Sequence, residues 1–168
     1  MAGLPASGKS AIAQRLANQL HAVLLDKDQV RAFLFKDNVD YEREQDDLCV
    51  NVMYNVARYH LSKRPATPVI LDGRSYSRHY QVEAVKDTAM RANVALFFIE
   101  CTCAPGTARL RLESDQGLHL AKNRDYEMYE RSRTAADVID EPKITLDTDN
   151  NSESECLQMA LSYLKTRS

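Results

Sequence analysis

The sequence predicts an α/β fold in which helices cover both faces of a parallel sheet. Short apolar runs alternate along the chain with stretches of helical periodicity, which is the pattern of successive strand–helix units. The runs are apolar almost throughout, as expected for strands buried on both faces. The runs at 22–26 and 68–72 each end in an aspartate, which would place acidic groups at the sheet edge where ligands bind.

A first helix over 11–20 places Ile12, Leu16 and Leu20 on one face. The elements predicted after it are a strand at 22–26, helices at 28–35 and within 40–63, a strand at 68–72, a helix at 77–91, a strand at 94–100, a helix at 105–114, a strand at 143–147 and a helix at 152–166. The long helix carries an apolar stripe that we expect in the core, formed by Leu48, Cys49, Val52, Met53, Val56 and Tyr59.

Length and composition narrow the class of protein. The 168 residues suit a single domain, and no apolar run of about 18 residues could form a membrane-spanning helix. The net charge of −2 gives no general attraction to nucleic acid or membranes. The four cysteines contain no CxxC pair and the four histidines no metal-ligand spacing. We therefore expect reduced cysteines, no zinc site and a cytoplasmic protein. We expect a monomer or a homodimer.

The segment 3–10 reads GLPASGKS and matches the phosphate-binding pattern G-x-x-x-x-G-K-[ST], the P-loop or Walker A motif. Its two glycines allow a tight turn whose backbone N–H groups approach phosphate oxygens closely. The helix predicted next adds the positive end of its dipole. We therefore expect a nucleotide to contact Gly3, Leu4, Pro5, Ala6, Ser7, Gly8, Lys9, Ser10 and Ala11.

Three side chains indicate that the nucleotide is ATP bound with Mg²⁺. Lys9 supplies a positive charge that reaches the β- and γ-phosphates, and Ser10 offers a hydroxyl to Mg²⁺. Asp72, at the end of the strand 68–72, occupies the position of the Walker B acid, which holds Mg²⁺ directly or through water.

A phosphate-binding loop follows a strand in the middle of the sheet. Only Met1 and Ala2 precede Gly3 in this sequence. Either the sequence begins inside that strand or the strand is abbreviated, and we favour the first because a central strand is the least dispensable part of a parallel sheet. We expect Met1 and Ala2 to be extended and hydrogen-bonded in the centre of the sheet.

The stretch LLDKDQVR supplies candidate groups for an acceptor. Asp26 and Asp28 follow a buried strand, and Arg31 lies three residues further along, on the same helical face as Asp28. A carboxylate here could accept the proton of a hydroxyl that attacks a γ-phosphate, and the arginine could hold an anionic group of the acceptor. The alternative is structural, with an aspartate N-cap and an i, i+3 salt bridge.

Two further stretches carry basic residues to the same edge. In LDGRSYSR, Arg74 and Arg78 follow Asp72 and are candidate substrate contacts, although Arg78 fits equally well on a solvated helix face. The polar region 114–133 contains Lys122 and Arg124 and is predicted to be a lid that closes over the phosphates. An exposed charged helix is the alternative for this region.

Together these motifs resemble the small-molecule and polynucleotide kinases of the P-loop superfamily, within the nucleoside-monophosphate-kinase-like group. LLDKDQVR is similar to the LDGDNVR element of adenylylsulfate kinases, GLHLAKN to their GLYKKAR lid, and VILDG to the DG turn of adenylate kinases. The D-x-x-R element also occurs in polynucleotide 5′-hydroxyl kinases and in zeta-toxin-like kinases. The serine-bearing turn and FTGID signature of adenylylsulfate kinases are absent, and Glu113 and Ser114 stand where relatives carry a second lid arginine.

The resemblance implies a three-layer P-loop NTPase sandwich with a five-stranded parallel sheet in the order 2-3-1-4-5, whose first strand is truncated in this sequence. One kinase domain would span residues 1–168, with its lid near 114–133. Asp28 would be the catalytic base beside Lys9 and Arg31, and Asp26 and Arg31 would position the acceptor. Arg124 is the candidate lid residue for the nucleotide, and adenine would lie near the loop LDTDNNS at 146–152.

The predicted function is transfer of the γ-phosphate of ATP to a hydroxyl of a small molecule, in the manner of an adenylylsulfate kinase. A polynucleotide 5′-hydroxyl kinase or other nucleotide kinase is an alternative, with nucleic acid the less favoured partner. An ATP-binding protein without catalysis is another. A regulatory GTPase would carry an N-K-x-D element, and KNRD at 122–125 has the wrong order. A motor ATPase would need a further helical domain.

Overall fold

Two pairs of parallel strands form the centre of the molecule in the computed structural model, which describes residues 1–115, 121 and 125–167. Strand β1 (Val23–Asp26) pairs with β2 (Val69–Asp72), and Asp26 lies opposite Asp72 at the end of that ladder. Strand β3 (Phe98–Thr102) pairs with β4 (Lys143–Asp147) in the same parallel sense. The prediction of an α/β fold with parallel strands is confirmed.

Met1 and Ala2 lie between the two strand pairs. The amino group of Met1 donates to the carbonyl of Leu71 in β2 at 2.8 Å. Ala2 is fully buried and forms a parallel bridge with Glu100 in β3, its N–H bonding Ile99 at 2.7 Å. These bonds match the expectation for the first two residues. The predicted five-strand order stays a prediction, because two residues form only one bridge and the regular ladders are two separate two-stranded sheets.

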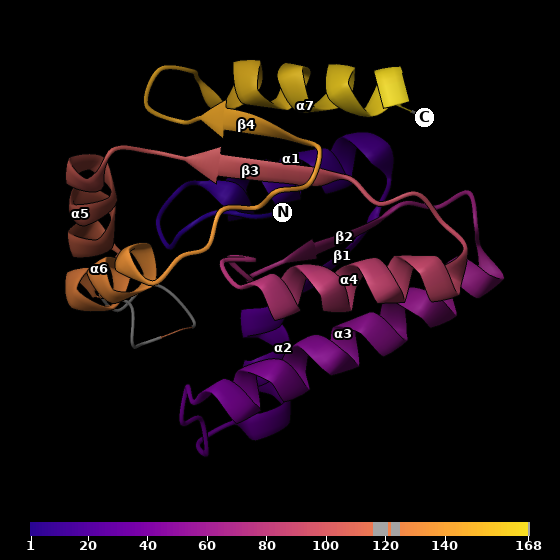
Figure 1. The fold of residues 1–168 in the computed structure, drawn as a ribbon, viewed down its shortest axis with the longest axis horizontal. Coiled ribbons are helices and arrows are strands. Elements are labelled where there is room, and N and C mark those ends of the chain that lie inside the picture. Colours follow the sequence, from indigo (N-terminus) through magenta and orange to yellow (C-terminus); the bar gives the residue numbers. More distant parts are fainter. Residues whose placement is uncertain (116–120, 122–124, 168) are drawn as a thin grey trace.

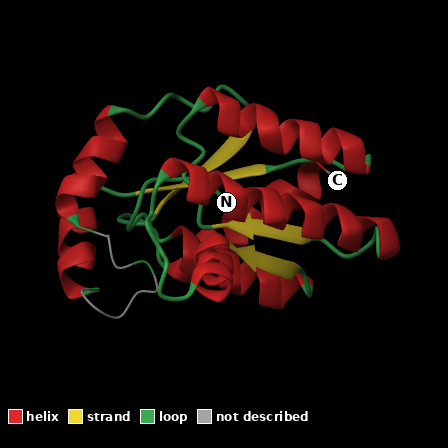
Figure 2. Ribbon diagram, turned by 90° about the horizontal axis from the view of Figure 1, so that it is seen from below, coloured by secondary structure: helices red, strands yellow, loops and turns green. Residues whose placement is uncertain are grey.

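Helices lie on both sides of the strands, as Figures 1 and 2 show. Their bounds are α1 (Lys9–Leu20), α2 (Lys27–Phe35), α3 (Arg43–Lys63), α4 (His79–Ala92), α5 (Pro105–Ser114), α6 (Tyr126–Thr134) and α7 (Glu153–Arg167). Helices α1 and α7 pack together on one side, and α3 and α4 pack together on the other. None of the helices in the described part of the chain is both long and apolar enough to span a membrane.

Both faces of β2 and β3 pack against core residues, which explains why their sequences do not alternate between apolar and polar residues. Leu71 and Phe98 face the cluster that includes Val50 and Tyr54 of α3. The neighbouring residues Ile70 and Ile99 face the opposite cluster, which holds α1 and α7. Successive strand residues therefore serve different halves of the core.

Two sequence expectations are corrected in detail. The apolar stripe of α3 is wrong at Leu48 and Tyr59, which are 51% and 65% exposed. The helix presents an adjacent face to the strands and α4, and its buried residues are Gln45, Cys49, Val50, Met53, Tyr54 and Ala57. The strand expected at 94–100 begins only at Phe98 and ends at Thr102, because β4 runs beside that part alone.

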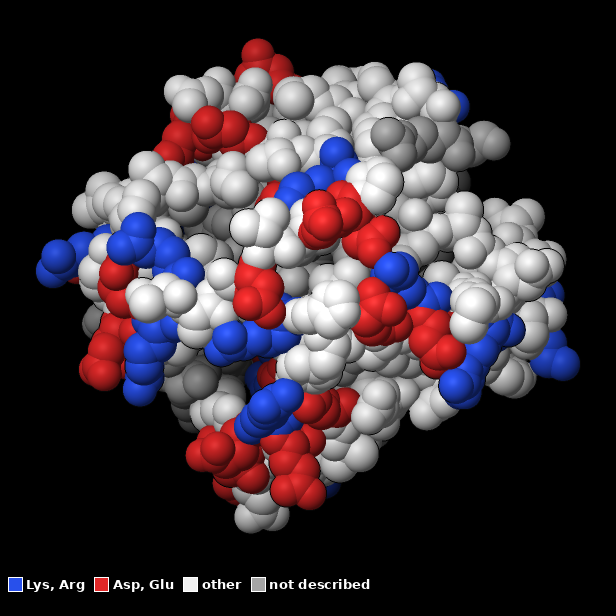
Figure 3. Space-filling view, in the orientation of Figure 1, with Lys and Arg blue, Asp and Glu red and all other residues white. Residues whose placement is uncertain are grey.

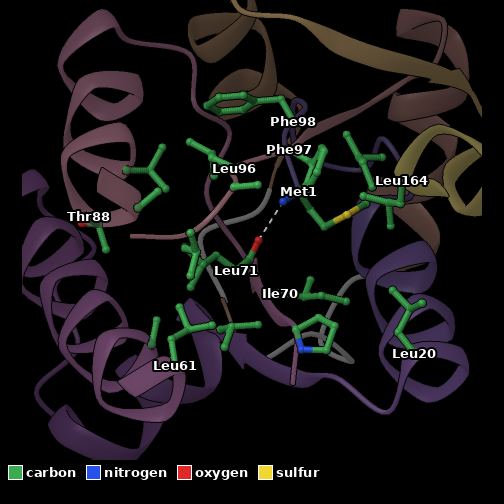
Figure 4. Close-up of a pocket in the computed structure, with 18 of the residues that line it drawn as sticks. Met1, Leu20, Leu61, Ile70, Leu71, Thr88, Leu96, Phe97, Phe98 and Leu164 are labelled. Atoms are coloured by element: carbon green, nitrogen blue, oxygen red, sulfur yellow. Dashed lines mark hydrogen bonds between the residues drawn. The ribbon is translucent and has the colours of Figure 1, made fainter. Parts of the chain in front are cut away.

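An apolar cavity of about 410 Å³ lies between β2 and β3, on the side of Met1 away from the phosphate-binding motif. Figure 4 shows Ile70 and Leu71 on one side of it and Leu96, Phe97 and Phe98 on another. None of the side chains that line this cavity is charged. The charged side chains that follow the strands lie at the opposite end, where the candidate site is.

The two-sided core makes a prediction about stability. Leu146 is fully buried between α1 and α7, so Leu146→Ala should lower the free energy of unfolding by about 2–5 kcal/mol through lost burial and a cavity. Leu110, which is 68% exposed, is the matched control, and its alanine variant should stay within about 0.5 kcal/mol of the parent. Urea denaturation measures both, and equal losses would contradict this arrangement of the core.

Candidate active site

The phosphate-binding motif adopts a loop that requires glycine. Gly3 and Gly8 have φ angles of 127° and 83°, in the region that other residues rarely adopt. A Cβ on Gly3 would lie 2.3 Å from the carbonyl oxygen of Cys101 and 2.8 Å from Ser7 Oγ. Helix α1 begins directly after Gly8, and no side chain caps its first turn. The N–H groups at that end are therefore oriented as an anion would need them.

The structure brings this loop together with the LLDKDQVR stretch. Lys9 and Ser10 line a cavity of about 220 Å³ that Asp28 and Arg31 of α2 also line. The lysine Nζ donates to the carbonyl of Leu4 at 3.2 Å, which holds the side chain back across its own loop. Groups predicted for the nucleotide and groups predicted for the acceptor thus share one cavity.

Asp72 has the environment of a cation ligand. It is 2% exposed at the end of β2, and its Oδ1 has no hydrogen-bond partner among the described residues. A buried carboxylate oxygen without a partner is costly to fold, which a bound cation would relieve. A carboxylate and a hydroxyl such as that of Ser10 are oxygen ligands of the kind that Mg²⁺ prefers, although Asp72 does not line the cavity that Ser10 lines. The chemistry of these two residues therefore fits Mg²⁺.

A buried ion cluster joins α2 to α3. Arg31 is 4% exposed, and its guanidinium donates to Asp28 Oδ1 at 2.8 Å and to Asp46 Oδ1. Lys27 Nζ lies 2.5 Å from the same oxygen of Asp46. The ring of Tyr41 covers the guanidinium at 5.3 Å. Asp46 was missed by sequence reasoning, since it lies on another helix and no local spacing links it to Arg31.

The Asp26 side chain caps α2. Its Oδ1 accepts the backbone N–H of Asp28 at 2.8 Å and that of Gln29 at 3.4 Å. This is the structural alternative that the sequence left open for the LLDKDQVR stretch. The salt bridge between Arg31 and Asp28 is the second part of that alternative, and it is present as well.

Of the five predicted substrate contacts, Asp26, Arg74 and Arg78 do not line the cavity that Asp28 lines. Arg74 is buried and donates to Asp47 and to the Tyr80 hydroxyl. Burial disfavours its charge, but the hydrogen bond and attraction to Asp47 outweigh burial, so the pKa of Arg74 is raised. Arg78 precedes α4 and donates to the backbone carbonyl of Ala135. Both arginines therefore have partners within the protein.

A second set of contacts, also missed from the sequence, fixes the back of the phosphate loop. Arg111 of α5 donates to the carbonyl of Ala6 at 3.1 Å and to Thr148 Oγ1 at 2.9 Å. The Thr148 hydroxyl lies 3.1 Å from the carbonyl of Ser7. The loop at 146–152, where adenine is expected, thus lies against the phosphate loop. The asparagine side chain of Asn150 and nearby backbone N–H groups lower the pKa of Asp147 there.

The predicted lid lies only partly within the described residues, and Lys122 and Arg124 fall outside them. The part at 126–134 is helix α6, whose Tyr129 is 2% exposed and packs with Ala6 and Leu112. The sequence left open a charged helix as the alternative to a lid. The region 126–134 is such a helix, and it packs against the phosphate loop.

The cysteines near the loop are thiols, and all four cysteines of the chain are unpaired. Burial raises the pKa of Cys101 to about 12, although the charge on Lys9 acts in the opposite direction. Burial also raises the pKa of Cys103, whose thiol contacts the carbonyl of Ala6. Neither group is a nucleophile at neutral pH, because the thiolate is the reactive form.

A family model described as an AAA domain (AAA_33) matches residues 1–117, so the chain belongs to this family. Its fold is the P-loop NTPase-like α/β fold. A comparison with curated protein sequences gave no match.

Solved structures of kinases share this fold. A gluconokinase from Sinorhizobium meliloti has a TM-score of 0.72 and 12% identity over 98% of this chain and 89% of its own. An APS kinase from Mycobacterium tuberculosis, in complex with AMPPNP and APS, has a TM-score of 0.70 and 15% identity over 98% and 94%. Kti12 from Chaetomium thermophilum, in complex with ADP-AlF3, has a TM-score of 0.70 and 16% identity over 96% and 95%.

The close approach at Gly3 can be tested by adding one methyl group. Gly3→Ala should lower the free energy of unfolding by about 1–3 kcal/mol or more and weaken nucleotide binding, because a Cβ there meets backbone in a strained conformation. In Gly106→Ala, the control, the added Cβ has no atom within 4 Å and lies in a helix. Calorimetric titration with ATP and a thermal melt measure both variants. Parent-like binding by Gly3→Ala would contradict the loop geometry.

Proposed function

We propose that the protein is a Mg²⁺- and ATP-dependent kinase that transfers the γ-phosphate of ATP to a hydroxyl group of a small molecule. One observation carries the proposal. Lys9 and Ser10 of the phosphate loop line the same cavity as Asp28, so a phosphate donor and a candidate base face a common space. Membership of the AAA domain family and the fold shared with kinases support it.

The loop backbone from Gly3 to Ala11 holds the phosphates, and Lys9 stabilises negative charge on the transferred group. Ser10 and Asp72 hold Mg²⁺, which supplies positive charge to the phosphate oxygens when it is bound. Adenine lies beside the loop at 146–152, on the side where Arg111 meets Thr148. The basic residue of the lid is Arg124. If Met1 and Ala2 are counted as the first strand, so that β1, β2, β3 and β4 are the second to fifth, the strands follow the order 2-3-1-4-5.

Asp28 orients the acceptor hydroxyl and receives its proton as the oxygen attacks the γ-phosphate. Arg31 keeps the carboxylate in place through the 2.8 Å bond. One kinase domain spans residues 1–168, and the region 114–133 closes over the phosphates to exclude water.

The role of Lys9 is tested by Lys9→Ala. Removing the ammonium group should weaken ATP binding at least about tenfold, because one charge-assisted contact to phosphate is lost. Alanine is a good helix former, so the thermal melt should hardly change. Lys165→Ala, at an exposed position of α7, is the charge-matched control. Parent-like affinity for ATP in Lys9→Ala would refute the phosphate-loop assignment.

Asp28→Asn separates chemistry from binding. Asparagine keeps the shape but cannot take a proton, so kcat should fall by roughly 10²–10⁴-fold while ATP affinity is retained. Asp37→Asn, at an exposed position just beyond α2, is the control and should leave kcat unchanged. The acceptor for this assay comes from a screen of a metabolite pool for ATP-dependent phosphorylation, run beside adenylylsulfate and a 5′-hydroxyl oligonucleotide. A normal kcat with a lowered melting temperature would show that Asp28 is only structural.

A further inference from the structure

The acceptor side of the cavity contains its own counter-charges. Two basic side chains, Lys27 and Arg31, face two acidic ones, Asp28 and Asp46. Each of the four is ion-paired: the lysine contacts Asp46 at 2.5 Å, and the arginine contacts Asp28 at 2.8 Å and also Asp46. Apart from Lys9 of the phosphate loop, the formal charges of the described lining residues therefore sum to zero.

Arg31 has its counter-charges within the protein, and two of its five N–H donors are bonded to them. Both of its terminal nitrogens already donate to carboxylates, and its Nε is buried without a partner among the described residues. Bidentate recognition of a phosphate, sulfate or carboxylate needs two donors that point at the ligand. An anionic acceptor would have to break ion pairs whose side chains are at most 23% exposed, and separating such pairs is costly.

The neighbouring arginine, Arg74, is also paired with an acidic side chain of the protein. Arg74, beside the cavity residues Gly73 and Ser75, is held by Asp47 on the next position of α3. On the face of the molecule that Figure 3 displays, acidic and basic side chains are mixed, so that face presents no broad positive field. The uncharged polar groups that line the cavity are hydroxyls, those of Ser10, Tyr41, Ser75 and Ser132.

We infer that the acceptor is an uncharged polyhydroxylated small molecule, and that Asp46 excludes anionic acceptors by holding Lys27 and Arg31 in internal ion pairs. The hydroxyls of such a molecule bond well to carboxylate and hydroxyl oxygens, and they need no counter-ion. Asp46 acts through Lys27 and Arg31, so it is a positioning residue. The inference deepens the proposed kinase function and rests on it.

Anion binding tests the role of Asp46 without knowledge of the acceptor. Sodium sulfate is titrated calorimetrically into the protein with the phosphate loop saturated by Mg²⁺ and AMPPNP. The parent should show no saturable sulfate binding. Asp46→Asn should gain it, tightening the apparent affinity at least about tenfold, because Lys27 loses its partner and Arg31 regains a donor. Glu44→Gln removes the same charge from an exposed position of the same helical turn and should behave as the parent.

Saturable sulfate binding by the parent, or no gain in a folded Asp46→Asn, would overturn the inference. A matched pair of acceptors, D-glucose and D-glucose 6-phosphate, tests it on the parent even where Asp46→Asn does not fold. Transfer to the sugar should exceed transfer to its phosphate at least about tenfold in kcat/KM. Preference for the sugar phosphate, adenylylsulfate or the oligonucleotide would overturn the inference and leave the kinase proposal standing. If the parent protein neither binds ATP nor turns it over, the kinase proposal itself is refuted.

Discussion

Parallel strands end at a common edge, and this constraint brings the phosphate loop and the aspartates at the ends of β1 and β2 together. Asp26 and Asp72 lie opposite each other because β1 and β2 share one register. The phosphate loop reaches the same edge because Ala2 is bonded alongside β3. The residues that follow each strand therefore meet in space although they are distant in sequence. A shift of register would separate Asp72 from the loop, which makes the strand pairing a condition for any chemistry here.

Helix α3 contributes two adjacent acids with separate partners. Asp46 holds Arg31 of α2, whereas Asp47 holds Arg74, which follows β2. Two buried arginines thus obtain their counter-charges from one helical turn. Burial of either guanidinium would be strongly unfavourable alone, so the turn and the arginines stabilise each other's position. The N-terminal end of α3 is consequently part of the candidate site, although the sequence there carries no recognisable motif.

The sequence predicted the features that depend on local pattern. The loop from Gly3 to Ser10, the helix after it and the aspartates at the ends of β1 and β2 were all foreseen, because glycine spacing and apolar runs are local signals. The pairing of Arg31 with Asp46 and that of Arg74 with Asp47 were not, because each joins elements that only the tertiary fold brings together. Arg111 was missed for the same reason, because its partner Ala6 lies 105 residues earlier in the sequence. The α3 stripe failed because α3 packs against α4 as well as the strands.

The contacts behind the phosphate loop determine how the loop meets its ligand. The Thr148 hydroxyl holds the carbonyl of Ser7, and a trans peptide then directs the N–H of Gly8 the opposite way. Arg111 restrains the carbonyl of Ala6 in the same manner. The backbone is thus ordered during folding, and little conformational entropy remains to be lost when an anion arrives. Residues outside the motif therefore hold the loop in its conformation before any ligand binds.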